Sequence, residues 1–153
     1  KKGILSTHLH SQGKYAEELM VIEPSSHSRL RTEFIPERIY PIMNGSNVFK
    51  HAVSRFPEVI MEALNKNGYT PSDINLLIPH QANLRISQFI QKTMKLRDDQ
   101  VYNNIMRYGN TTAASVPIAL TEAWQEGKVK EGDLVCLAAF GSGFTWASAL
   151  IRW

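Results

Sequence analysis

An apolar strand that ends at a proline and leads directly into a helix indicates an α/β fold for this chain. Residues 75–85 have the sequence NLLIPHQANLR. The short apolar run at 75–78 is typical of a strand that is buried on both faces, and helical periodicity begins after Gln81. His80 therefore falls at a strand-to-helix turn, and the carboxyl ends of strands are where open α/β sheets place their ligands.

Two further polar loops follow candidate strands. The sequence RYGNTT at 107–112 places Asn110 after a possible short strand at 101–105, and FGSGF at 140–144 joins two more predicted strands. A neutral imidazole offers one N–H, an amide offers two, and a glycine-rich loop offers free backbone N–H groups. Such donors suit an oxygen that gains negative charge, such as that of an enolate. The alternative is that His80 and Asn110 only cap turns.

The sequence favours His80 as a neutral donor over His80 as a strong base. No carboxylate lies in its motif or in that of Asn110, and a carboxylate partner is what usually raises a histidine pKa. The alternative that an acidic residue distant in sequence folds close to His80 stays open. Cys136 lies in an apolar strand, where desolvation keeps a thiol inert. Ser115 and Ser142 lack the strand-to-helix elbow of hydrolases, so the chain offers no evident nucleophile.

Hydrophobic periodicity predicts a mixed β-sheet covered by helices, which is an α/β fold. We expect strands at 4–10, 18–22, 75–78, 134–140 and 145–152, an irregular segment at 23–41, and helices at 46–67, 83–95 and 114–125. Pro57 predicts a kink near Phe56 or two abutting helices, because proline removes a backbone hydrogen bond. Phe89 and Trp124 are predicted to face inward.

Size and composition predict one globular domain without a membrane span. The chain has 153 residues, of which 43% are hydrophobic, and its longest apolar run is only the seven residues 134–140. The formal charge of +3 is small and the basic residues are scattered, which argues against nucleic acid binding. A single cysteine fits a reducing compartment, so we expect a cytoplasmic location.

Two groups of polar side chains have both a functional and a structural interpretation. His8 and His10 share one face of the first predicted strand, but no third metal ligand is suggested, so we expect two exposed histidines and no metal site. Arg85, Lys92 and Lys95 fall on one side of a predicted helix. That side is either a solvated helix face or a docking surface for an acidic partner.

Five segments of the chain share one resemblance. They are GILSTHL at 3–9, NVFK at 47–50, LIPHQANLRI at 77–86, GNTTAASVP at 109–117 and AFGSGFTW at 139–146. All five resemble β-ketoacyl-acyl carrier protein synthase III, a thiolase-fold condensing enzyme whose chain has two similar halves. The resemblance implies that 1–153 is the carboxyl-terminal half, in which a strand and an irregular segment (1–41) lead into a compact α/β core (42–153).

The resemblance also implies an activity, that of an acyltransferase in fatty acid biosynthesis. An acyl group would pass from acyl-coenzyme A to a cysteine in the absent amino-terminal half, and not to Cys136. His80 and Asn110 would then hold the thioester oxygen of malonyl-acyl carrier protein while it loses carbon dioxide, and the enolate would attack in a Claisen condensation. Ser142, which replaces a common glycine, would supply a backbone N–H to the oxyanion hole.

Binding residues and partners follow from the same resemblance. It implies coenzyme A and pantetheine contacts at Gly45, Phe49, Ala52, Ala82 and Asn83, and carrier-protein contacts at Lys50, Arg85 and Lys92. The expected partners are acyl-coenzyme A, malonyl-acyl carrier protein, the amino-terminal half and a second copy in a homodimer, with no cofactor beyond the thioester substrates. Two alternatives remain: a non-catalytic condensing-enzyme-like subunit, and a ketosynthase of polyketide or alkyl-quinolone metabolism.

Overall fold

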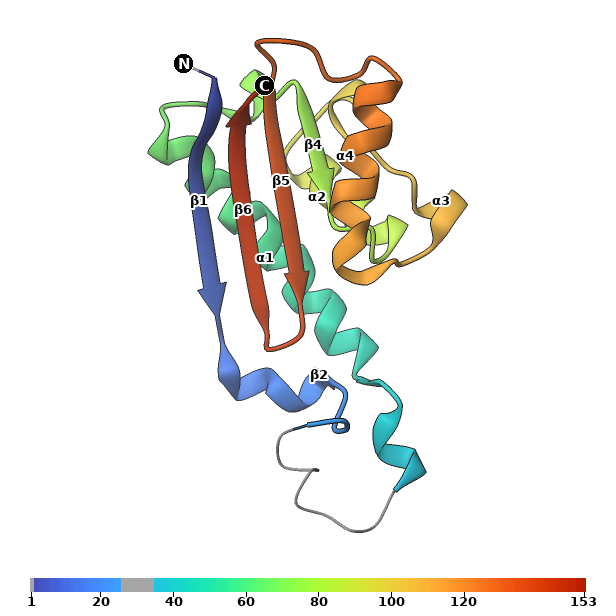
Figure 1. Ribbon diagram of the computed structural model, residues 1–153. Coiled ribbons are helices and arrows are strands. Elements are labelled where there is room, and N and C mark those ends of the chain that lie inside the picture. Colours follow the sequence, from blue (N-terminus) through green and yellow to red (C-terminus); the bar gives the residue numbers. More distant parts are fainter. Residues whose placement is uncertain (1, 26–34) are drawn as a thin grey trace.

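A four-stranded mixed sheet forms the centre of the molecule. The computed structural model describes residues 2–25 and 35–153 (Figure 1). The strands are β1 (Gly3–Ser11), β4 (Leu76–Pro79), β5 (Leu134–Gly141) and β6 (Thr145–Arg152), in the spatial order β1-β6-β5-β4. β6 runs antiparallel to both of its neighbours, whereas β5 and β4 are parallel. The predicted mixed sheet is confirmed.

Helices and short turns connect these strands. The α-helices of the described residues are α1 (Gly45–Lys66), α2 (Leu84–Thr93), α3 (Ile105–Tyr108) and α4 (Ser115–Gln125). The shorter elements are the 3-10 helices η1 (Gly13–Glu18), η3 (Pro36–Ile39), η4 (Pro71–Asp73), η5 (Asp98–Gln100) and η6 (Thr112–Ala114), and the two-residue strands β2 (Leu19–Met20) and β3 (Ile42–Met43), which pair with each other. No helix of the described ranges is long and apolar enough to cross a membrane.

Alternation of side chains along the strands divides the core into two layers. Leu77 and Cys136 pack on the side of α1 and α2, whereas Ile78 and Val135 pack on the side of α4. In Figure 1, α1 crosses behind the strands and α4 lies beside β4. The sheet is therefore covered fully on one face, while on the other face α4 covers only the β4 end.

α1 buries the apolar stripe that the sequence predicted. Its buried residues are Ala52, Phe56, Val59, Ile60, Ala63 and Leu64. Each fully buried Val, Ile, Leu or Phe side chain in this list contributes about 1.5–3 kcal/mol to folding. The side chain of Asn44 caps the helix by accepting a hydrogen bond from the Asn47 N–H at 3.4 Å. The helix continues through Pro57, so the predicted alternative of two abutting helices is wrong. Burial on both sides of the proline offsets the hydrogen bond that it removes.

Two aromatic residues predicted to face inward are instead exposed. Phe89 is 45% exposed and Trp124 is 57% exposed. The buried stripe of α4 consists of Ser115, Ala119 and Ala123, which are spaced four residues apart. Trp124 lies one residue beyond this stripe, which rotates it by about 100° around the helix. Phe89 is displaced in the same way from the buried Ile90 of α2. The predicted helix faces were one residue too wide.

The amino-terminal part differs from the prediction in its details. The strand expected at 18–22 is reduced to β2, and a 3-10 helix, η1, lies between β1 and β2. The expected irregular segment at 23–41 lies partly outside the described residues, and η3 forms within its described part. β1 is longer than predicted and pairs with β6 along its whole length, with one irregularity between Ile4 and Ser6.

Candidate active site

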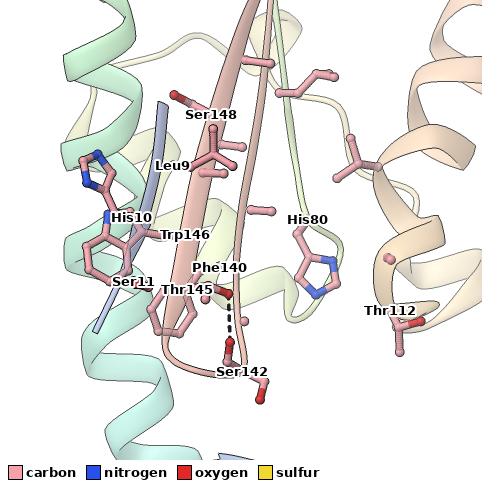
Figure 2. Close-up of a pocket in the computed structure, with 18 of the residues that line it drawn as sticks. Leu9, His10, Ser11, His80, Thr112, Phe140, Ser142, Thr145, Trp146 and Ser148 are labelled. Atoms are coloured by element: carbon pink, nitrogen blue, oxygen red, sulfur yellow. Dashed lines mark hydrogen bonds between the residues drawn. The ribbon is translucent and has the colours of Figure 1, made fainter. Parts of the chain in front are cut away.

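An open cavity lies on the face of the sheet that α4 leaves uncovered. It has a volume of about 1040 Å³, and His80, Asn110 and Ser142 all line it. In the view of Figure 2, the His80 ring lies between the β5–β6 turn that carries Ser142 and the segment that carries Thr112. The structure therefore brings together the three residues that the sequence predicted for catalysis and for the oxyanion loop.

Parallel pairing of β4 with β5 explains why His80 and Ser142 meet. Pro79 pairs with Ala138, and the His80 N–H continues the ladder by donating to the Ala138 carbonyl at 2.8 Å. Because the carboxyl ends of parallel strands lie at the same edge of a sheet, the loop after β4 and the turn after β5 emerge together.

His80 sits in a partly buried pocket beside the start of α4. Its Nδ1 lies 2.5 Å from the hydroxyl oxygen of Ser115. Desolvation by burial lowers the pKa of His80 below its ordinary value, so the ring is neutral at pH 7. No carboxylate of the described residues contacts the ring. These surroundings favour the neutral donor over the strong base.

The Asn110 amide is held by its own loop. Its Oδ1 accepts a hydrogen bond from the Thr112 N–H at 2.9 Å, which directs Nδ2 the other way, and Nδ2 has no partner within the described ranges. Gly109 has φ 68° and ψ −161°, a conformation that is almost restricted to glycine. Thr112 adopts a left-handed φ of 53°, which is rare for a β-branched residue. The loop is thus strained where it presents Asn110.

Gln81 fixes the distance between the loops of His80 and Asn110. Its side chain is only 3% exposed. Nε2 donates to the carbonyls of Pro79 at 2.7 Å and Tyr102 at 3.3 Å, and Oε1 accepts from the N–H groups of Asn104 at 3.0 Å and Ile105 at 3.2 Å. These bonds replace strand pairing, so the strand predicted at 101–105 is wrong except for a single bridge at its first residue.

Ser142 lies at the exposed turn between β5 and β6. Its hydroxyl donates to the Leu19 carbonyl of β2 at 2.6 Å. Its own carbonyl accepts from the Thr145 hydroxyl at 2.8 Å (Figure 2). The Ser142 N–H has no backbone acceptor within the described residues. Gly143 has φ 131°, and a Cβ there would lie 2.7 Å from Thr145 Cγ2, so the turn requires glycine.

The residues predicted to contact coenzyme A do not line this cavity. Gly45 and Phe49 lie in the first turns of α1, and Ala82 and Asn83 lie just before α2, whose N-terminus the Asn83 side chain caps. Ala52 is 1% exposed and belongs to the core beneath α1. Their role stays a prediction.

The predicted carrier-protein contacts share one side of the molecule. Lys50 of α1 and Arg85 and Lys92 of α2 are exposed, and these two helices pack against each other. Within the described ranges none of the three side chains forms an ion pair. Their positive charges are therefore available to a partner.

Cys136 is unsuited to nucleophilic catalysis. Its side chain is fully buried in β5, and burial raises the pKa of the thiol to about 12. A thiol with that pKa is not ionised at pH 7, and only the thiolate is a good nucleophile. The predicted inert cysteine is confirmed.

His8 and His10 are not simply exposed histidines. The Glu62 carboxylate of α1 lies 3.2 Å from His8 Nδ1 and 2.6 Å from His10 Nε2, so both rings are tied to the helix. Among the residues that the structure describes, no group of three His, Cys, Asp or Glu is arranged to hold a metal ion. The trio connects β1 to α1.

Comparison with known proteins places the chain in a family. The family model of the 3-oxoacyl-acyl carrier protein synthase III C terminal matches residues 64–153. The chain belongs to this family. A β-ketoacyl-acyl carrier protein synthase III of Clostridioides difficile is 46% identical over 99% of this chain and 46% of its own, and that of Rhodospirillum centenum is 43% identical over 99% and 45%.

Solved structures show the same fold. The 3-oxoacyl-acyl carrier protein synthase III of Aquifex aeolicus has a TM-score of 0.87 and 40% identity over 100% of this chain and 45% of its own. The priming β-ketosynthase of the R1128 polyketide pathway has a TM-score of 0.85 and 30% identity over 98% and 45%. The chain thus has the thiolase-like fold that the sequence predicted, and it spans less than half the length of these relatives.

Two site residues were not predicted from the sequence. Ser115 contacts His80, and Gln81 joins the two site loops. The only sequence signal for Ser115 was its place at the start of a predicted helix, which equally fits helix capping. Gln81 stood next to His80 in a polar turn, where most side chains are solvated.

Proposed function

We propose that this chain is the carboxyl-terminal part of a β-ketoacyl-acyl carrier protein synthase III. The observation that carries the proposal is that His80, Asn110 and Ser142 line one cavity as uncharged donors. Family membership and relatives of that name support the same reaction. The whole activity would be the decarboxylative condensation that starts fatty acid synthesis, which makes the complete protein an acyltransferase.

The reaction would proceed in two stages. First, a cysteine of the amino-terminal half attacks acyl-coenzyme A, and coenzyme A leaves as the thiol. Second, the carbon–carbon bond of malonyl-acyl carrier protein breaks, carbon dioxide leaves, and the electron pair moves toward the thioester oxygen. His80 and Asn110 donate hydrogen bonds to this developing oxyanion, which lowers the barrier because the donors are already in place.

The enolate carbon then attacks the acyl group on the cysteine. A second oxyanion forms on the acyl carbonyl, and the free N–H of Ser142 suits it as a hydrogen-bond donor. Collapse of this tetrahedral intermediate releases the cysteine thiolate and leaves the β-ketoacyl product on the carrier protein. Cys136 has no part in these steps because its thiol is buried and protonated.

The proposal includes binding residues, partners and location. Coenzyme A and pantetheine would contact Gly45, Phe49, Ala52, Ala82 and Asn83, and the carrier protein would dock on Lys50, Arg85 and Lys92. The complete protein would be a cytoplasmic homodimer that needs no cofactor beyond its thioester substrates, with neither nucleic acid nor membrane as a partner.

A polyketide priming ketosynthase is the second candidate. The R1128 structure supports it, because that protein is 30% identical over nearly the whole chain. The two candidates share the chemistry and differ in the pathway that uses it. A non-catalytic subunit is less well supported, since such a subunit has no need for both His80 and Asn110.

Acyl transfer from acyl-coenzyme A tests whether the nucleophilic cysteine lies in the amino-terminal half and not in this chain. We expect this chain alone to gain no label from radiolabelled acetyl-coenzyme A, and a complete protein with an amino-terminal half to gain one label per active site. Cys136→Ala in the complete protein is the control and should leave labelling unchanged. Labelling of the isolated chain that disappears in Cys136→Ala would overturn the proposal.

A further inference from the structure

The hydroxyl of Ser115 joins both ends of the turn that carries His80. Ser115 is the first residue of α4 and is 2% exposed. Its Oγ lies 2.5 Å from His80 Nδ1 and 3.2 Å from the backbone nitrogen of Gln81. Neither the site chemistry described above nor helix capping assigns a role to this hydroxyl.

Counting donors and acceptors fixes the direction of these two hydrogen bonds. A backbone N–H only donates, so Ser115 Oγ accepts from Gln81. The hydroxyl hydrogen is buried and needs an acceptor, and His80 Nδ1 is the other partner that this hydroxyl has among the described residues. If Nδ1 carried a hydrogen instead, Ser115 would accept twice and its own buried O–H would have no partner.

The other ring nitrogen must then carry the single hydrogen of the neutral imidazole. We propose that Ser115 is a positioning residue that holds His80 in the tautomer with its hydrogen on Nε2, the nitrogen left to donate into the cavity. This inference rests on the proposed function for its catalytic meaning. The start of α4 adds to the effect, because the positive end of a helix disfavours a charged imidazolium beside it.

Asn110 is oriented in the same way as His80, by a hydrogen bond to its acceptor atom. The Thr112 N–H occupies Asn110 Oδ1 and leaves Nδ2 to donate, just as the Ser115 hydroxyl occupies His80 Nδ1 and leaves Nε2. In both side chains a protein donor occupies the acceptor atom. The cavity therefore receives N–H groups from both residues without a change of protonation, which suits an oxyanion.

The tautomer can be observed directly in the complete protein. With ¹⁵N-labelled histidine, we expect the wild-type His80 spectrum to show a protonated Nε2 and an unprotonated Nδ1, with His80→Gln used for assignment. In Ser115→Ala, the two tautomers should mix. A wild-type spectrum with the hydrogen on Nδ1 would overturn the inference whether or not Ser115→Ala folds.

Kinetics provide a second, independent test. Ser115→Ala should lower the rate of malonyl-acyl carrier protein decarboxylation by about tenfold or more, by analogy with metal-binding histidines that lose the partner orienting their ring. KM and acyl transfer to the cysteine should change less than about twofold, and Ser115→Thr should restore most of the rate because it keeps the hydroxyl. Unchanged decarboxylation in Ser115→Ala would contradict the positioning role.

Ser87→Ala is the matched control. Ser87 is also a buried serine at the start of a helix, 4% exposed, and its hydroxyl has no partner in the described part of the chain. We expect this variant to keep the wild-type rate. His80→Ala separates the two proposals: if it too keeps full decarboxylation, the proposed function fails, whereas an inactive His80→Ala beside a fully active Ser115→Ala overturns only the role of Ser115.

Discussion

The amide of Gln81 joins two loops that are distant in sequence and that both lead to a site residue. Its four hydrogen bonds take up two carbonyls and two N–H groups that no strand partner satisfies. Because buried backbone groups are costly to leave unpaired, this side chain holds the loops together beyond the single bridge between Leu77 and Val101.

Replacement of Gln81 by leucine should therefore be strongly destabilising. The volume is similar but all four bonds are lost, so we expect the free energy of unfolding to fall by about 2–4 kcal/mol. Chemical denaturation of the complete protein measures this change. Gln88→Leu makes the same substitution at an exposed position of α2 and should change stability by less than about 0.5 kcal/mol. Equal effects of the two substitutions would show that the Gln81 bonds contribute nothing.

Residues of this kind could not be predicted from the sequence. His80 and Ser142 were predictable because each lies in a polar turn after a strand, where α/β folds bind ligands. Asn110 was predicted by the same reasoning, but in the structure its loop follows the short helix α3 and not a strand. Gln81 and Ser115 owe their roles to partners 21 to 35 residues away. Their local sequence fits solvated turns or caps equally well, so only the tertiary structure distinguishes these roles.

At the scale of elements, β1 is attached to α1 by side chains as well as to β6 by its backbone. Glu62 contacts both His8 and His10, and Asn67 donates to the Ser6 hydroxyl at 2.7 Å. The hydrogen bond from His10 is the main cause that lowers the pKa of Glu62 below its ordinary 4.5. The edge strand thus depends partly on an ionised carboxylate.

This contact should make stability depend on pH in the acid range. A carboxyl with a lowered pKa in the folded state stabilises above its unfolded pKa, and the stabilisation is lost as pH falls through the folded value. We expect Glu62→Gln to lower the free energy of unfolding by no more than about 1 kcal/mol at pH 7, because Glu62 is 42% exposed. The difference should shrink below about pH 4.5.

Urea denaturation of both proteins at several pH values measures this dependence. Glu58→Gln is the control, since Glu58 lies one turn earlier on α1 and pairs with Arg55. It should leave the acid dependence of the wild type in place. If the free energy of unfolding of Glu62→Gln falls with decreasing pH as steeply as that of the wild type, the ionised Glu62 carboxylate does not stabilise the fold.

The prediction of elements from sequence succeeded where periodicity was long and failed where it was short. α1, β5 and β6 each have a continuous pattern, and all three formed as predicted. The strand predicted at 101–105 does not form because the Gln81 side chain, and not a neighbouring strand, bonds its backbone. The predicted burial of Phe89 and Trp124 is wrong because a helix of about three turns gives too few positions to fix the edge of its buried face.

At the scale of the whole molecule, the proposed catalytic cavity and the proposed carrier-protein surface lie on opposite sides of the sheet. The cavity lined by His80, Asn110 and Ser142 occupies the face that α4 leaves open. The basic residues Lys50, Arg85 and Lys92 lie on α1 and α2, which cover the other face. A long flexible substrate arm could bridge such a distance, which fits a pantetheine-linked substrate whose protein carrier binds the basic side.

Reversal of one basic charge tests that docking surface. Arg85→Glu in the complete protein should raise the apparent KM for malonyl-acyl carrier protein by about tenfold or more, and the effect should weaken as salt rises. Lys128→Glu makes the same kind of change just beyond α4 and should have little effect. Unchanged carrier-protein kinetics in Arg85→Glu at low salt would contradict the docking role and show that this surface is only a solvated helix face.

The central claim, that His80 and Asn110 hold a developing oxyanion, is tested most directly by measuring the two half-reactions separately. Decarboxylation of malonyl-acyl carrier protein and acyl transfer from acyl-coenzyme A are each measured in the complete protein with His80→Ala or Asn110→Ala. Each substitution should lower decarboxylation by about two to three orders of magnitude, the scale for loss of one oxyanion donor, and should affect acyl transfer much less. Small and equal losses in both half-reactions would contradict the account.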